Sequence, residues 1–110
     1  MKIIIVALFI AAFMAPAAAG QAYDFWTTEN VTPTSGIKTI VYFAAEWPAY
    51  VYLYINGDLY PWSPCILSGE GGDNWVTEYP PGLVAGDIWK IEVSNANHTL
   101  FNSASGVVVN

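Results

Sequence analysis

The stretch AYVYLYINGDLY, residues 49–60, decides the fold class of this chain. Tyrosines at positions 50, 52 and 54 alternate with aliphatic residues at 51, 53 and 55. Because successive side chains of a strand point to opposite faces of a sheet, this alternation predicts a strand over 50–55 with an aliphatic face and a phenol face. Asn56-Gly57 then favours a tight hairpin turn, since both central residues of a type I′ turn need positive φ. The returning strand is expected over 58–62.

The rest of the chain shows further short strands and no helical periodicity. In IWKIEVS, residues 88–94, we expect Trp89, Ile91 and Val93 to face the core and Lys90 and Glu92 to face outward. Other strands are expected over 23–26, 37–45, 74–79 and 107–110, with a short apolar piece at 65–67 inside a loop and a polar connection over 95–106. This spacing predicts a single all-β domain, an antiparallel β-sandwich of the immunoglobulin or fibronectin type III class.

The first 19 residues have the order of a secretory signal peptide. Lys2 precedes an apolar run from Ile3 to Met14, and small residues follow at 17–19. The run is short for a membrane-spanning helix, which needs about 20 apolar residues. We expect cleavage at Ala19 or Gly20, a mature domain over 20–110 and a secreted protein, either extracellular or in a cell wall. Retention of this segment as a membrane anchor is the less favoured alternative.

The charge of the chain limits its partners. After cleavage two lysines remain against nine acidic residues, a formal charge of 2 − 9 = −7, and the chain has no arginine. Nucleic acids and anionic membranes are bound through basic patches. We therefore expect no nucleic-acid partner and no membrane contact once the leader is removed.

Catalytic and metal-binding signals are weak. Cys65 and His98 are the only residues of their kinds, and no nucleophile–base spacing or Cys/His cluster is present. We expect no enzyme activity and no cofactor. Cys65 is either a buried thiol, a reactive thiol or half of an intermolecular disulfide. The acidic residues Asp58, Glu70 and Asp73 form a weak calcium candidate, since Ca²⁺ takes oxygen ligands.

Two tripeptides match the acceptor for N-glycosylation. They are Asn30-Val-Thr32 and Asn97-His-Thr99, and both fall in expected loops. Loop positions suit this modification because it needs an exposed asparagine.

The second half of the chain resembles a known family. Pro80, Leu83, the corner Ala85-Gly86-Asp87 and the strand 88–94 with its alternating Trp89, Ile91 and Val93 are similar to a family pattern, as are Ser105-Gly106 and the VYLYINGD stretch. The pattern is that of the immunoglobulin-like N-terminal domain of yeast cell-wall synthesis and Ser/Thr-rich GPI-anchored proteins. The resemblance implies the fold and a place at the cell surface or wall, but no site. Trp89 departs from it, standing where the family usually has tyrosine. Since the sequence ends at Asn110, we expect the domain alone, without the family's Ser/Thr-rich stalk and GPI tail.

The phenol face has three readings, which the sequence leaves open. Tyr50, Tyr52 and Tyr54, joined by Tyr60 and Trp62 across the hairpin, would form a platform for sugar rings. The same residues would serve in a protein interface, where Tyr and Trp are enriched. They would also serve as ordinary cross-strand packing.

The expected last strand, 107–110, offers an edge for pairing with another chain. We therefore expect a secreted, non-catalytic domain with an adhesive or structural role, self-associating or bound to a surface or matrix protein. The alternative is a carbohydrate-binding module that holds a polysaccharide.

Overall fold

The strands of this protein form where β-branched and aromatic residues alternate, and turns rich in Gly, Pro and Asn separate them. The computed structural model describes residues 22–72 and 74–110, and no helix occurs among them. Its strands are β2 (Tyr23–Thr27), β3 (Ile37–Ala44), β4 (Ala49–Ile55), β5 (Asp58–Leu59), β6 (Cys65–Leu67), β7 (Trp75–Glu78), β8 (Ile88–Ser94) and β9 (Phe101–Val107). The described part of the chain therefore contains no helix able to span a membrane.

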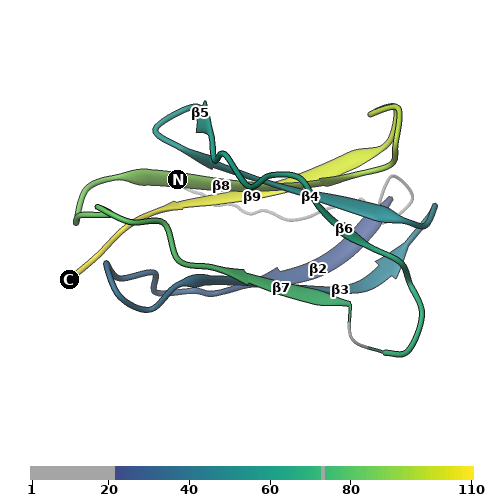
Figure 1. Cartoon of the computed structure of the whole chain (residues 1–110), viewed down its shortest axis with the longest axis horizontal. Coiled ribbons are helices and arrows are strands. Elements are labelled where there is room, and N and C mark those ends of the chain that lie inside the picture. The colour runs from purple at the N-terminus through teal and green to yellow at the C-terminus, as the bar shows by residue number, and fades with distance from the viewer. Residues whose placement is uncertain (1–21, 73) are drawn as a thin grey trace, which may run out of the picture.

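The strands form two antiparallel sheets that lie in separate layers (Figure 1). One sheet has the order β2-β3-β7. The other has the order β5-β4-β8-β9, and β6 also pairs with β4. The all-β prediction is confirmed, and the two layers are consistent with a β-sandwich.

The core lies between the layers and is built from the inward side chains of each strand. Val51 and Leu53 of β4 and Ile91 and Val93 of β8 are buried as the alternation predicted. Asn102 ties the layers together at the start of β2, where its Oδ1 accepts hydrogen bonds from the backbone N–H groups of Ala22 (3.1 Å) and Tyr23 (2.7 Å).

The end of the chain differs from the prediction. The last strand is β9, Phe101–Val107, which pairs with the whole of β8, whereas residues 108–110 form no strand. The inward positions of β9 carry small or polar residues, which give no hydrophobic alternation, so its sequence resembles that of a polar connection. At one of these positions only glycine fits without rearrangement, because a Cβ at Gly106 would lie 2.8 Å from Cζ2 of the Trp89 indole. The expected edge at 107–110 is therefore wrong, and β9 is the edge strand.

The returning strand of the β4–β5 hairpin is also shorter than predicted. It was expected over 58–62, but β5 ends at Leu59. Pro61 has no N–H to donate to a sheet ladder, so the pairing stops before it. The last backbone hydrogen bond of the hairpin runs from the Tyr60 N–H to the Leu53 carbonyl (2.8 Å).

One core position carries an unsatisfied polar atom, and we expect its removal to stabilise the fold. Thr39 is fully buried, and its Oγ1 has no hydrogen-bond partner within the described part of the chain. Burying an unpaired hydroxyl costs about 1–3 kcal/mol. Thr39→Val should therefore raise the free energy of unfolding by about 1 kcal/mol in urea denaturation. Thr77→Val, on the outer face, is the control, and a loss of stability in Thr39→Val would contradict the assignment.

Candidate functional site

The outer face of the three-stranded sheet carries a row of apolar side chains, most of them exposed. The strand register places Trp26 of β2 opposite Ile40 of β3, and Ile40 opposite Trp75 of β7. Trp26 is 37% exposed and Trp75 is 47% exposed. A bulge in β3 adds the exposed residues Tyr42 and Phe43 at one end of the row. We call Trp26, Ile40, Tyr42, Phe43 and Trp75 the tryptophan face.

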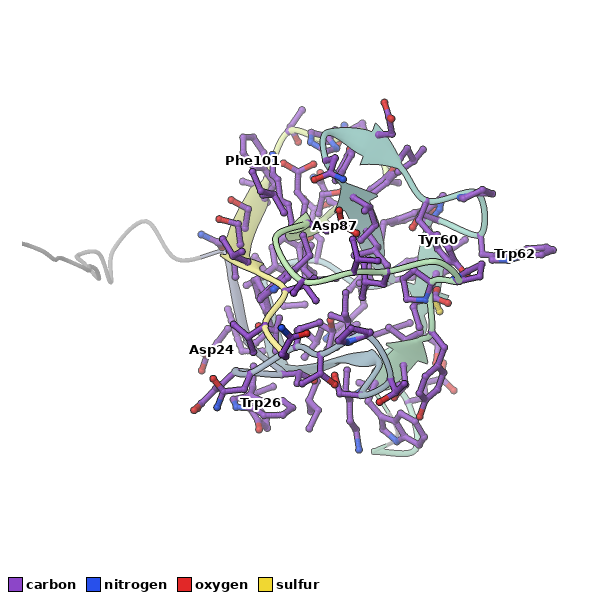
Figure 2. All side chains as sticks on the ribbon, turned by 90° about the vertical axis from the view of Figure 1, so that its left-hand side faces the viewer. Asp24, Trp26, Tyr60, Trp62, Asp87 and Phe101 are labelled. Carbon is purple, nitrogen blue, oxygen red and sulfur yellow. The ribbon has the colours of Figure 1, made fainter. Side chains whose placement is uncertain are left out.

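This face has charges of opposite sign at its two ends. Lys38 precedes Ile40 by two residues on β3, and its Nζ lies 4.6 Å from the centre of the Trp75 ring, a cation–π contact. Asp24 is exposed at the other end, opposite Phe43 in the register. Figure 2 shows Asp24 and Trp26 at the periphery of the molecule, with their side chains away from the core.

Sequence reasoning missed the tryptophan face. Its tryptophans come from separate strands, 49 residues apart, and only the strand register brings them together. The alternation of Trp75 and Thr77 was visible in the sequence, but nothing in it identified β3 as the neighbour of β7.

The predicted tyrosine stripe is on the outer face of the other sheet. Tyr50, Tyr52 and Tyr54 are half-buried and face Ser94, Glu92 and Lys90 of β8, respectively. Two of the three tyrosine rings are in contact with neighbouring side chains. His98 meets Tyr52 edge-on with ring centres 5.8 Å apart, and Lys90 Nζ lies 5.4 Å from the centre of the Tyr54 ring.

Glu92 is the unexpected residue of this face. It was predicted to be exposed, but it is only 7% exposed. His98 Nε2 lies 3.1 Å from one carboxylate oxygen, and Lys90 Nζ lies 3.9 Å from the other. Burial, then the Glu92 carboxylate and Tyr52, raise the pKa of Tyr54. The tyrosine stripe is thus an interlocked cluster of half-buried side chains.

Tyr60 and Trp62 do not join the stripe. They line a pocket of about 440 Å³ at the end of the molecule, between the β4–β5 hairpin and the loop joining β7 to β8. Trp62 is 75% exposed and projects away from the body of the protein (Figure 2). The five predicted platform residues are therefore divided between two places.

The rim of this end pocket is held by a hydrogen-bonded corner. Asn56 donates to Asp87 Oδ1 (3.0 Å), and the Val84 N–H donates to Asp87 Oδ2 (3.0 Å). Asn56 Oδ1 also accepts from the Ile88 N–H (2.9 Å). The bond from Val84, followed by that from Asn56, lowers the pKa of Asp87, so this carboxylate is ionised at neutral pH.

The corner should weaken in acid. A carboxylate whose pKa is lowered by folding contributes stability above its unfolded pKa, about 3.9, and loses it as the pH falls through the folded pKa. Asp87→Asn should therefore have a lower thermal midpoint than the parent at pH 7, with the gap closing as the pH drops below about 4. Circular dichroism melts from neutral to acidic pH measure this, and a gap that does not change with pH would refute it.

Cys65 is half-buried on β6 and packs against the core. Burial, and secondarily the Glu78 carboxylate, raises the pKa of the thiol. Because the thiolate is the reactive form, Cys65 should react with an aromatic disulfide reagent at pH 8 more slowly than free cysteine does. Urea unfolding should bring the rate to that of free cysteine. Equal rates in the folded and unfolded protein would contradict this placement.

The remaining predicted residues are placed as follows. Asn30 and Asn97 are both exposed outside strands, and Asn97 Oδ1 accepts a hydrogen bond from Thr99 Oγ1 (2.9 Å). Their glycosylation stays a prediction. Asp73 lies outside the described residues. Among the described residues, no group of three or more His, Cys, Asp and Glu side chains is placed to hold a metal ion.

Comparisons with family models, curated proteins and solved structures found no match to this chain. The resemblance to the yeast cell-wall domain therefore stays a prediction.

Proposed function

We propose that this protein is a secreted, non-catalytic, immunoglobulin-like domain that self-associates through its tryptophan face and serves an adhesive or structural role outside the cell. The observation that carries the proposal is the row Trp26–Ile40–Trp75, in which both tryptophans are exposed and the half-buried Ile40 lies between them. Contiguous exposed apolar patches on soluble proteins mark interaction sites, and tryptophan is prominent among residues that dominate binding energy. The leader sequence supports secretion, and the resemblance supports a place at a cell surface or wall.

The charges at the ends of the face favour a second copy as the partner. Lys38 and the Asp24–Phe43 pair are about 16 Å apart along the strands, with Ile40 near the midpoint. A two-fold axis in the plane of the face and perpendicular to the strands exchanges these two ends. It brings Lys38 of one copy within about one strand spacing, ~5 Å, of the second copy's Asp24, while the tryptophan rows meet near the axis.

The size of the face indicates that each contact is weak. Three strands spaced about 4.8 Å apart and up to about 26 Å long cover roughly 360 Å². This is under half of the ~800 Å² per partner that stable complexes bury. We expect a dissociation constant on the order of 0.1 mM. Strong adhesion would then come from many copies held on one surface.

Sedimentation velocity of the secreted chain, residues 20–110, tests the proposal. From about 10 µM to about 1 mM the sedimentation coefficient should rise from the monomer value toward that of a dimer. Lys38→Asp should abolish the rise through like-charge repulsion, and so should Asp24→Lys. An equimolar mixture of the two variants should restore it. A monomer at every concentration would refute self-association.

A second candidate is carbohydrate binding through the tyrosine stripe. It is favoured by the line of three phenols beside the Glu92–His98 pair, which places hydrogen-bonding groups next to aromatic rings. The test is retention on insoluble glucans, cellulose and chitin, with the Tyr50→Ser, Tyr52→Ser, Tyr54→Ser triple variant beside the parent. Retention of the parent, with loss in a triple variant that still folds, would favour this candidate over packing.

A further inference from the structure

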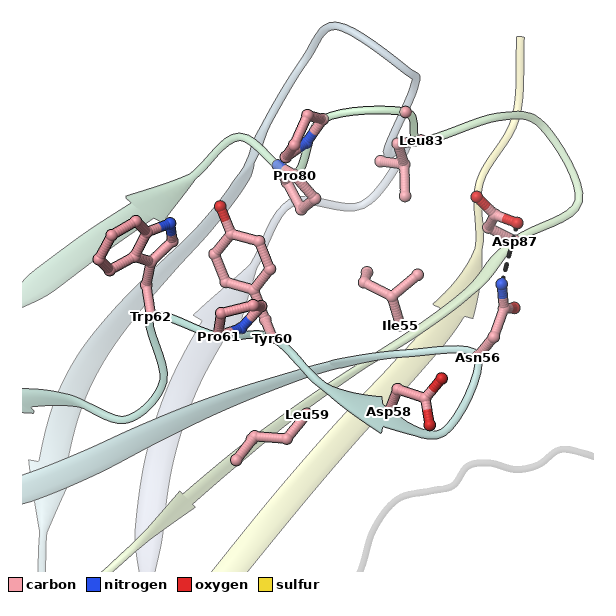
Figure 3. A pocket seen from close by; sticks show the side chains of 12 residues that line it. Ile55, Asn56, Asp58, Leu59, Tyr60, Pro61, Trp62, Pro80, Leu83 and Asp87 are labelled. Carbon is pink, nitrogen blue, oxygen red and sulfur yellow. Dashed lines mark hydrogen bonds between the residues drawn. The ribbon is translucent and has the colours of Figure 1, made fainter.

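The end pocket is not used by the proposed self-association, and its lining changes in character from one end to the other (Figure 3). Trp62 and Tyr60 stand with Pro61 and Pro80 at one end. Ile55 and Leu83 lie in the middle. Asn56, Asp58 and Asp87 lie at the far end. Its volume, about 440 Å³, falls within the roughly 300–1,000 Å³ of pockets that bind small molecules or short segments.

The aromatic end suits an extended, proline-containing peptide. Grooves lined with aromatic side chains bind segments in the polyproline II conformation, because the segment is already extended and loses little entropy on binding. Trp62 offers a largely exposed indole for such a contact, and Tyr60, half-buried against the core, supplies a fixed second wall.

The polar end suits a cation. Asp87 is ionised, and each of its oxygens accepts one hydrogen bond, which leaves further lone pairs free. Within the part of the chain that the structure describes, neither Asp58 nor Asp87 forms an ion pair, and the two lysines contact rings on the outer faces of the sheets. The negative charge of this end is therefore uncompensated.

The walls are held in place before any ligand binds. The corner formed by Asn56 and Asp87 fixes the polar end. At the other end, the Ser63 N–H donates to the Tyr60 carbonyl (2.9 Å), and Ser63 Oγ accepts from the Leu53 N–H (2.9 Å). A pocket with fixed walls loses less conformational entropy on binding than a mobile one.

We propose that the end pocket binds an extended, proline-containing segment of a partner protein, with an arginine or lysine side chain at the Asp58–Asp87 end. An arginine fits best, since its planar guanidinium pairs with a carboxylate through two hydrogen bonds. The protein would then have two independent contacts, one with its own copies and one with a basic partner.

The test is titration of the ¹⁵N-labelled secreted chain with a synthetic acetylated peptide, Pro-Pro-Leu-Pro-Pro-Arg amide. The Trp62 indole N–H resonance should shift on binding, and the Trp75 resonance should not. Exchanging the peptide's arginine for glutamate should weaken binding about tenfold or more. Trp62→Ala should weaken it about tenfold. Asp58→Asn should lower the affinity for the arginine peptide about threefold. The affinity for a peptide with alanine in place of the arginine should stay within about twofold of the parent's value.

Trp75→Ala is the matched control and should leave peptide affinity unchanged while impairing self-association. The two proposals can therefore fail separately. Absence of any Trp62 shift at millimolar peptide would overturn the pocket proposal, as would equal binding of the arginine and glutamate peptides. A Trp62 shift with a soluble β-glucan oligosaccharide and none with the peptide would also overturn it, assigning the pocket to sugars.

Discussion

Trp89→Ala is expected to lower the free energy of unfolding by about 3–5 kcal/mol, the usual cost of removing a large buried aromatic side chain. The Trp89 indole is 4% exposed and belongs to the core between the two sheets. It lies so close to Gly106 on β9 that a Cβ there would approach its Nε1 to 3.0 Å. For a domain of this size, such a loss is a large share of a typical total of about 5–15 kcal/mol.

The control is the same substitution at an exposed tryptophan. Trp62→Ala should change the free energy of unfolding by about 0.5 kcal/mol or less, since surface substitutions away from structural features have small effects. Urea denaturation followed by circular dichroism measures both variants. Equal effects of the two substitutions would contradict the placement of Trp89 in the core.

The Trp26→Ser, Trp75→Ser double variant is expected to remain monomeric at every concentration at which the parent associates. Each tryptophan is the largest side chain at its end of the row, and truncation of such interface anchors costs about 2 kcal/mol or more. Two such truncations would raise a dissociation constant on the order of 0.1 mM beyond the measurable range. Sedimentation velocity of parent and variant, side by side, gives the result.

The matched control for the double variant is Trp62→Ser, which removes an exposed indole from the end pocket and leaves the tryptophan face intact. It should associate like the parent. Loss of association in Trp62→Ser together with unchanged association in the double variant would move the contact to the end pocket and refute the proposed face. Near-parental thermal midpoints for both variants are required, because all three substituted tryptophans lie on the surface.

The sequence predicted those strands whose own residues alternate strongly. The inward positions of β8, and those of β4 after Ala49, carry bulky aliphatic or aromatic side chains, so both inward faces could be predicted and the bounds were right to within one residue. β9 has Asn102, Ala104 and Gly106 at its inward positions. These small or polar residues fit because the Trp89 indole and the start of β2 occupy the space beneath β9. Such tertiary packing cannot be predicted from the local sequence pattern.

The candidate sites were harder to predict than the fold for the same reason. The tyrosine stripe lies within one strand and was visible in the sequence. The tryptophan face needs the order β2-β3-β7, which depends on long-range pairing. The burial of Glu92 needs His98 to fold back over it from the β8–β9 turn, where His98 has a φ of 60°. Tyr60 was expected beside the stripe, but Leu59 is the residue that pairs with Tyr54.

The most direct test of self-association through the tryptophan face is a dilution series followed by the indole N–H resonances of the chain's five tryptophans. If the chain associates through this face, the Trp26 and Trp75 resonances should move along a common binding curve from about 1 mM to about 10 µM. The resonances of Trp89, in the core, and Trp62, in the end pocket, should stay in place. Resonances that do not move on dilution, or a shift confined to Trp62, would contradict self-association through the tryptophan face.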